Sequence, residues 1–266
     1  MYSFTYHRPT GLRQAGNMLA KLADAKLIAG GQTLLPTMKL RLASPANLID
    51  IGRLEGLAGI ELKGRSLVIG ATTRHADVAT SPVVHEHLPA LADVAEQIGD
   101  PHVRHMGTIG GSVANNDPNA DYPAAVLGLG ATIVTTKRRI KADDFFKGLF
   151  ETALEPDEII TKVMFPLVKK AAYVKFPNPA SRYALVGVFV SKRGSENRVA
   201  VTGAGASGVF RVPAFEAALK KRFAAKSLDG LTVLATGLAG DIHGSAEYRA
   251  HLIGVLAKRA VAKATA

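Results

Sequence analysis

The chain of 266 residues contains no cysteine. It can therefore form no disulfide, build no thiolate zinc site and ligate no iron–sulfur cluster of its own. Long hydrophobic runs are absent as well, since none reaches the roughly 18 residues that a membrane span needs. The N-terminus has no basic patch followed by an apolar segment, so we expect a cytoplasmic protein without a membrane span.

Acidic residues are scarce compared with basic ones. Asp and Glu number 22 against 33 Lys and Arg, which gives a formal net charge of +11. The basic residues are scattered apart from small clusters at Lys137–Arg139 and Lys220–Arg222, and aromatic residues make up only 6% of the chain. We therefore favour a basic surface that meets acidic partners or anionic cofactors over a nucleic-acid-binding module.

The residues that are present describe a globular protein, 47% hydrophobic and 21% charged. Apolar residues at helical spacing predict a helix over 11–24, and "KLIAGG" predicts a short strand that runs into glycines. A helix over 34–42 and a buried strand over 47–51 would complete a compact unit of strand, loop, helix and strand.

A second region begins with "GIELKGRSLVIGA", whose two apolar runs flank a turn and predict a hairpin over 59–71. Further along we expect helices over 88–98 and 121–129, and strands over 131–136 and 157–166. The sequence pattern changes at 166–172, where a proline and a lysine pair occur, so we place a domain boundary there. Beyond it we expect strands over 183–192 and 198–205, a helix over 213–223, and a last helix that Ser245 caps.

Two glycine pairs stand out because each follows or precedes an apolar run and sits beside hydroxyl or amide side chains. Gly30-Gly31 lies in "AGGQTLLP", and Gly110-Gly111 lies in "TIGGSVANNDPNADYP", which we interpret as a polar loop over 108–123. Paired glycines let the backbone approach a ligand and aim successive N–H groups at an anion. Together the two pairs suit a diphosphate, although either one alone is more often a tight turn.

Two other patterns are weaker. "GAGASG" at 203–208 matches the dinucleotide-binding pattern, but "VFRVP" follows it and delays the helix to Pro213, so we interpret it as an ordinary loop. His85, His87, His102 and His105 have no accompanying ligand set and are interpreted as surface residues.

Three segments, "AGGQTLLPTMKLRLASPANLIDI", "DPHVRHMGTIGGSVANNDPNADYPAA" and "EYRAHLIGVLAKRAV", resemble a known family in their order and spacing. The chain is similar to the FAD-binding medium subunit of molybdenum hydroxylases of the aerobic carbon monoxide dehydrogenase and xanthine dehydrogenase type. The resemblance implies an α/β (α+β) fold like that of vanillyl-alcohol oxidases. It would comprise two FAD-binding α/β subdomains over 1–55 and 56–168, and a C-terminal domain over 169–266 with a small antiparallel sheet and helices.

The resemblance also implies a set of FAD contacts. Ala29, Gly30, Gly31, Gln32 and Thr33 would wrap the diphosphate together with Thr108, Ile109, Gly110, Gly111 and Ser112, the last of which stands where the family often has Asn or Asp. Asn115 would reach the flavin half, and Asp121 would hydrogen-bond the polyol or ribose. Lys175 and Tyr183 match a basic contact and an aromatic near the flavin ring, and Ile160 matches an apolar contact to the adenine.

In the family this subunit passes electrons outward. Substrate is oxidised at a molybdenum cofactor on a large subunit, [2Fe–2S] clusters on a small subunit carry the electrons, and FAD delivers them to an acceptor. The resemblance thus implies an oxidoreductase with noncovalent FAD, an iron–sulfur small subunit and a molybdenum large subunit, as a dimer of heterotrimers. A stand-alone flavin oxidoreductase of the same fold is the alternative.

Overall fold

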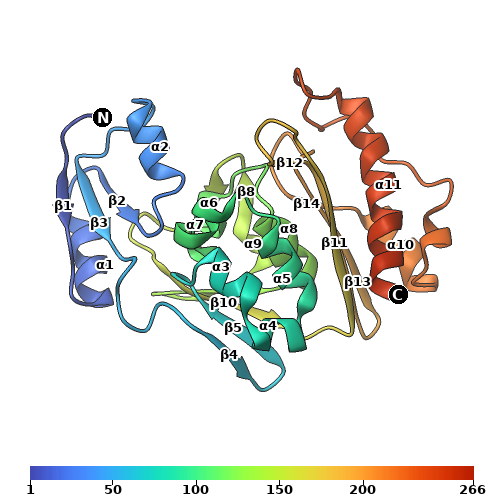
Figure 1. Ribbon diagram of the computed structural model, residues 1–266, viewed down its shortest axis with the longest axis horizontal. Helices are drawn as coiled ribbons and strands as arrows, with labels where there is room; N and C mark the ends of the chain where they lie inside the picture. The colour runs from blue at the N-terminus through green and yellow to red at the C-terminus, as the bar shows by residue number, and fades with distance from the viewer.

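The computed structural model describes residues 1–266 and places three β-sheets in a row along its longest axis (Figure 1). None of its helices combines the length and the apolar character that a bilayer crossing would require. The mixed α/β (α+β) architecture expected from the sequence is confirmed. The three-domain division remains a prediction.

The N-terminal sheet is parallel, in the order β1-β3-β2. Its elements are β1 (Thr5–His7), α1 (Leu12–Lys21), β2 (Ala25–Ile28), α2 (Leu34–Lys39) and β3 (Asn47–Asp50). The predicted amphipathic helix is α1, which buries Ala15 against Ile49 of the sheet. The strand β2 runs directly into the first glycine pair, as expected, so this sheet holds residues 29–33 at the edge of the molecule's centre.

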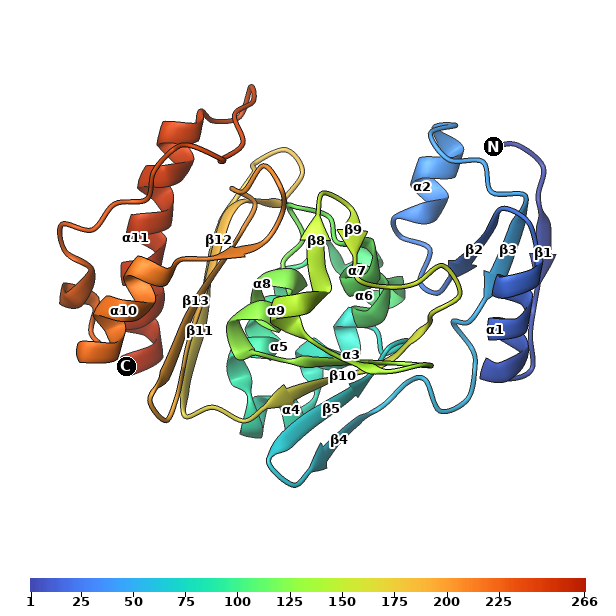
Figure 2. The same cartoon turned by 180° about the vertical axis from the view of Figure 1, so that it is seen from behind.

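The middle sheet is antiparallel, in the order β4-β5-β10-β6-β7. Its strands are β4 (Ile60–Lys63), β5 (Ser66–Gly70), β6 (Thr132–Thr135), β7 (Arg139–Lys141) and β10 (Ile160–Pro166). The predicted hairpin is confirmed, with Ile60 opposite Ile69. A small hairpin of β8 (Phe146–Gly148) and β9 (Glu151–Thr152) stands beside the sheet (Figure 2). The Asn116 amide donates to its carbonyls at Gly148 and Glu151, both at 2.8 Å.

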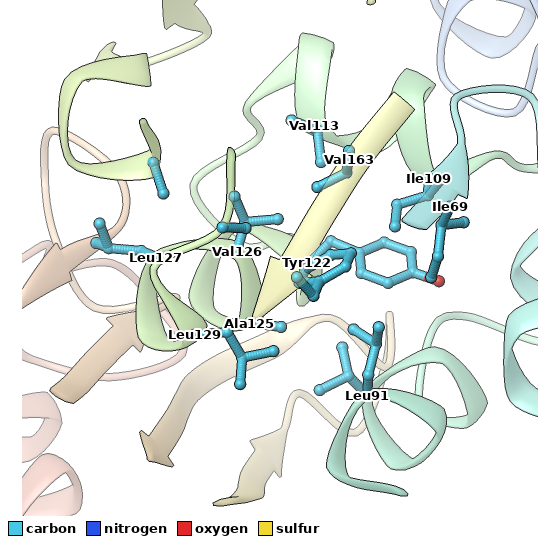
Figure 3. Close-up of a cluster of buried hydrophobic side chains, with 14 of the residues drawn as sticks. Ile69, Leu91, Ile109, Val113, Tyr122, Ala125, Val126, Leu127, Leu129 and Val163 are labelled. Carbon is cyan, nitrogen blue, oxygen red and sulfur yellow. The ribbon is translucent and has the colours of Figure 1, made fainter. Parts of the chain in front are cut away.

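Short helices pack beside the middle sheet, and some of them also contact the C-terminal sheet. They are α3 (His75–Thr80), α4 (Pro82–His87), α5 (Pro89–Glu96), α6 (Pro101–Met106), α7 (Ile109–Asn115), α8 (Tyr122–Leu129) and α9 (Ala142–Phe145). Every residue of α8 is buried, and its side chains form the middle of the largest apolar core (Figure 3). The interpretation of 108–123 as one loop is wrong in its first part, because Thr108 caps α7 by accepting from the Gly111 N–H.

The C-terminal sheet is antiparallel, in the order β11-β12-β13-β14. Its strands are β11 (Lys170–Pro177), β12 (Ala184–Arg193), β13 (Glu196–Thr202) and β14 (Phe210–Arg211), followed by α10 (Pro213–Lys221), the 3₁₀ helix η1 (Ala225–Leu228) and α11 (Ala246–Thr265). Because α8 packs on one face and α11 on the other, β12 is buried continuously from Ala184 to Ser191. Such two-sided burial requires an unbroken apolar strand.

Two sequence-based interpretations of this region are confirmed. Ser245 caps α11 by accepting from the Tyr248 N–H at 3.2 Å. The glycine pattern at 203–208 forms turns after β13, and the next helix begins at Pro213. This pattern therefore opens no helix, and none of its residues lines the cavity described below.

Arg249 ties α11 to the C-terminal sheet. The residue is 2% exposed, and its guanidinium donates to the carbonyls of Leu185 (2.8 Å) and Gly203 (2.6 Å) and to Asp241 (2.8 Å). We expect Arg249→Leu to lower the free energy of unfolding in urea by about 3 kcal/mol, because buried carbonyls lose their donors. Arg259→Leu, at an exposed site on the same helix, is the control. Equal urea midpoints for the two variants would contradict this role of Arg249.

Candidate functional site: a cofactor cavity between the first two sheets

A cavity of about 900 Å³ lies where the N-terminal sheet meets helices α6 and α7. All of the predicted site residues except Ile109 and Lys175 line it: Ala29, Gly30, Gly31, Gln32, Thr33, Thr108, Gly110, Gly111, Ser112, Asn115, Asp121, Ile160 and Tyr183. Ile109 is fully buried in the apolar core near Ile69 and Tyr122 (Figure 3). Segments far apart in the sequence thus line one cavity.

The first glycine loop offers free hydrogen-bond donors. None of the backbone N–H groups of residues 29–33 donates to an acceptor within the chain. Gly31 has φ +70°, a left-handed conformation that glycine adopts without strain and that turns successive N–H groups into one concave surface. Consecutive unpaired N–H groups on the wall of a cavity form a binding surface for an anion.

The second glycine loop differs from this expectation. The Ile109 N–H donates to the carbonyl of Thr73, and the Gly110 N–H donates to that of Ala71. The Gly111 N–H donates to Thr108 Oγ1 at 3.2 Å, and the Ser112 N–H to the Thr108 carbonyl. The N–H groups of residues 109–112 are therefore already satisfied, so the two glycine pairs are not equivalent.

Gly30 and Gly110 are needed for contacts between backbones. A Cβ on Gly30 would collide with the carbonyl oxygen of Met106 and stand 2.8 Å from Gly107 Cα. A Cβ on Gly110 would stand 2.6 Å from the carbonyl oxygen of Ala71. These two glycines bring the first loop, the second loop and the segment after β5 into direct main-chain contact.

Asp121 lies at the cavity wall at the start of α8, with its carboxylate buried. Tyr173 donates to one oxygen at 2.5 Å, and Lys175 donates to the other at 2.9 Å. Burial raises the pKa of Asp121, although Lys175 and Tyr173 act in the opposite direction. The Lys175 ammonium, 3% exposed, also donates to the Gln97 carbonyl at 2.9 Å, so it holds Asp121 in place and does not itself line the cavity.

Tyr183 lies at the rim of the cavity, with 47% of its surface exposed. Burial of its hydroxyl and the charges of Asp117 and Asp121 raise its pKa, so the phenol stays protonated over the ordinary pH range. Burial also raises the pKa of Asp117. The protonated tyrosine at the rim can pack against a ring system. The two carboxylates on the wall can accept hydrogen bonds from hydroxyl groups.

The cavity wall near Ile160 carries an ionised carboxylate, Glu158, that is paired with an arginine. The Glu158 side chain is buried, and it accepts from Thr135 Oγ1 (2.6 Å) and from Arg138 (2.9 Å). Although its burial acts to raise the pKa, the hydrogen bonds from Arg138 and Thr135 hold it at about 2. This end of the cavity thus presents apolar surface, including Ile159 and Ile160, beside a satisfied ion pair.

His75 is a lining residue that the sequence did not indicate. It opens α3, is 4% exposed, and packs against the ring of Tyr122 with the centroids 5.3 Å apart. Burial, with a smaller effect from Arg104, lowers its pKa to about 4, so the imidazole is neutral at pH 7. A histidine in the polar run "TTRHAD" carries no local signal of burial, because its environment is made by α6, α8 and Gly107.

These observations fit FAD. Free N–H groups at residues 29–33 suit an anionic diphosphate, the carboxylates of Asp117 and Asp121 suit ribose or ribityl hydroxyls, and apolar walls suit planar rings. The first loop satisfies the requirement for a diphosphate most directly, since its donors have no other acceptor. The chemistry of the cavity therefore matches a dinucleotide that contains a flavin.

Comparison with known proteins agrees with this chemistry. Residues 2–168 match the family model described as the FAD binding domain in molybdopterin dehydrogenase. The chain is 37% identical to the carbon monoxide dehydrogenase medium chain of Hydrogenophaga pseudoflava, over 97% of this chain and 96% of the relative. It is likewise 37% identical to the nicotine 6-hydroxylase medium subunit of Paenarthrobacter nicotinovorans, over 98% and 97% of the two chains.

Solved structures show the same relationship over the whole length. A structure of carbon monoxide dehydrogenase from Hydrogenophaga pseudoflava superimposes with a TM-score of 0.89 and 36% identity, over 99% of this chain and 98% of that one. Reconstituted CO dehydrogenase from Oligotropha carboxidovorans gives 0.91 and 34%, with the same coverage. The fold and the site define an FAD-binding subunit of an oxidoreductase. The chain belongs to the family of FAD-binding medium subunits of molybdenum hydroxylases.

We expect Gly30→Ala to destabilise the protein by roughly 1–3 kcal/mol and to abolish FAD retention, because the added Cβ pushes the two loops apart. Thermal unfolding and the flavin content of the purified protein measure the two effects. Gly16→Ala on α1, where a Cβ meets nothing within 4 Å, is the control. Gly205 also lies outside the cavity, but it is unsuitable as a control because a Cβ there would collide with the Gly208 carbonyl. A Gly30→Ala protein as stable as the wild type would refute the contact.

The neutral state of His75 makes stability depend on pH. Below pH 6.5 the unfolded chain binds a proton at this residue, whereas the folded chain resists it down to about pH 4. We therefore expect the free energy of unfolding to fall as the pH is lowered from 6.5 to about 4. This loss should be roughly 3 kcal/mol larger in the wild type than in His75→Gln. Urea unfolding at several pH values checks this. His251→Gln, exposed on α11, should keep the wild-type slope.

Proposed function

We propose that this chain is the FAD-carrying electron-transfer subunit of a heterotrimeric molybdenum hydroxylase. It would receive electrons from iron–sulfur clusters on a small subunit and pass them to an external acceptor. The observation that carries the proposal is the run of unpaired N–H groups at residues 29–33 on a cavity with FAD-like chemistry, in a chain that has no cysteine.

Different residues of the chain would contact different parts of the cofactor. Residues 29–33 would donate to the diphosphate, with Thr108–Ser112 beside it. Asn115 would meet the flavin half, and Asp121, held by Lys175 and Tyr173, would accept from ribityl or ribose hydroxyls. Ile160 would contact the adenine, and Tyr183 would cover the flavin ring. When bound, the flavin supplies both one-electron and two-electron redox chemistry.

The partner subunits are inferred from what this chain lacks and from its relatives. A chain with no cysteine cannot ligate the clusters that would feed electrons to a flavin, so they must lie on another subunit. Relatives named as medium chains imply larger and smaller companions. We propose an iron–sulfur small subunit and a molybdenum large subunit in a dimer of heterotrimers, docked with the help of the +11 charge. The cytoplasmic location stays a prediction.

Cofactor content tests the first part of the proposal. We expect one FAD per chain, held without a covalent bond, because the cavity provides hydrogen bonds and no thiol is available for a thioether link. Acid precipitation should release all of the flavin into the supernatant, where chromatography identifies it. Recovery of FMN, or of no flavin after incubation with FAD, would contradict the assignment.

Co-expression with the neighbouring genes tests the second part. We expect the chain to elute from size-exclusion chromatography with two companions that contain iron and molybdenum, and to hydroxylate nothing when it is alone. The alternative predicts otherwise. A chain that stays alone and oxidises an organic substrate without either metal would be a stand-alone flavin oxidoreductase.

A further inference from the structure

We propose that His75 donates a hydrogen bond from Nε2 to the diphosphate of FAD, so that a third segment, residues 71–75, belongs to the binding site. The inference rests on the proposed function and adds a residue to it. Neither the glycine loops nor the motifs that identify the family contain this position.

The main chain fixes this segment against the second glycine loop. The His75 N–H donates to the Gly107 carbonyl at 2.9 Å. In return, the N–H groups of Ile109 and Gly110 donate to the carbonyls of Thr73 (3.0 Å) and Ala71 (2.8 Å). His75 therefore has a fixed backbone position directly beside residues 107–110, which lie against the first loop at Gly30.

The two nitrogens of the imidazole have different environments. Nδ1 is sealed from solvent and has no hydrogen-bond partner. Nε2 also makes no hydrogen bond within the chain, but it is not among the sealed atoms, and the residue lines the cavity. Nε2 lies against the second loop, 2.6 Å from where a Cβ of Gly107 would stand. A buried ring nitrogen that keeps access to a cavity and lacks a partner is placed for a ligand atom.

The charge state of the His75 ring and the chemistry of phosphate determine which ring nitrogen carries the proton. Burial keeps the ring neutral at pH 7, so it carries one proton, and the cation of Arg104 also disfavours a second proton. Phosphate oxygens only accept hydrogen bonds, so a neutral imidazole can meet them only with the proton on the nitrogen that faces the cavity. The packing of Tyr122 against the ring keeps the imidazole in this orientation. Thr72, whose hydroxyl also lacks a partner, lies in the same segment.

The test measures FAD binding to the full chain freed of flavin. We expect His75→Phe to weaken FAD about 10- to 100-fold, the effect of losing one hydrogen bond to a charged group. His75→Asn, which keeps an N–H donor, should recover part of the affinity. ADP, which has the diphosphate without a flavin, should also bind more weakly to His75→Phe. His251→Phe, at an exposed position, is the matched control and should bind like the wild type.

NMR of ¹⁵N-histidine in the wild type gives an answer even where a variant folds poorly. We expect the Nε2–H tautomer of His75, with a proton resonance that shifts when FAD or ADP is added. Equal FAD affinity of folded His75→Phe and wild type, or an Nδ1–H tautomer with FAD bound, would overturn the inference and leave the proposed function intact. Weaker FAD binding with unchanged ADP binding would overturn the diphosphate contact. A wild type that binds no FAD would instead overturn the proposed function.

Discussion

The site depends on one contact between backbones. Gly30 lies so close to Met106 and Gly107 that no side chain fits between them, and Gly110 lies nearly as close to Ala71. Three segments that are distant in the sequence therefore meet main chain to main chain. The cavity opens beside this meeting point, and its walls are positioned only because the backbones can touch.

Packing of α8 against the C-terminal sheet also positions the walls of the cavity. The helix α8 is buried on all sides, between the middle sheet and β12, and Gly128 packs so closely on Phe189 that its Cβ would stand 2.7 Å from that ring. Ser191 donates to the Gly128 carbonyl at 2.6 Å. These contacts fix the end of α8, and Asp121 at its start is held by Tyr173 and Lys175 from β11. The C-terminal sheet thus takes part in shaping a cavity that lies mostly between the first two sheets.

Local patterns in the sequence predicted what local physics determines. Apolar periodicity identified α1 and α11, the Lys-Gly-Arg-Ser turn identified the β4–β5 hairpin, and the glycine pairs identified the region of the site. The helix α7 was missed because two glycines, a serine and an asparagine make "IGGSVAN" a poor helix by propensity; Thr108 and burial stabilise it. The helix α6 could have been found, since Asp100 before Pro101 is a capping signal.

The inequality of the two glycine pairs was beyond sequence reasoning for a different reason. Both pairs have the same composition, and only the partners of their N–H groups distinguish them. The partner of the Gly110 N–H, the Ala71 carbonyl, comes from a segment nearly forty positions away, while the Gly111 N–H donates to the nearby Thr108 hydroxyl. Burial of His75 arises in the same way, from elements that no local pattern connects.

The committed donors of the second loop also bear on what the cofactor adds to the chain. The N–H groups of residues 109–112 donate within the chain, whereas those of residues 29–33 have no acceptor within the chain. The main-chain donors of residues 109–112 are thus committed by folding, whereas the consecutive free donors lie in the first loop. The second loop can accordingly keep these main-chain hydrogen bonds whether or not a cofactor is present, whereas the main chain of the first loop would gain its partners only from the cofactor.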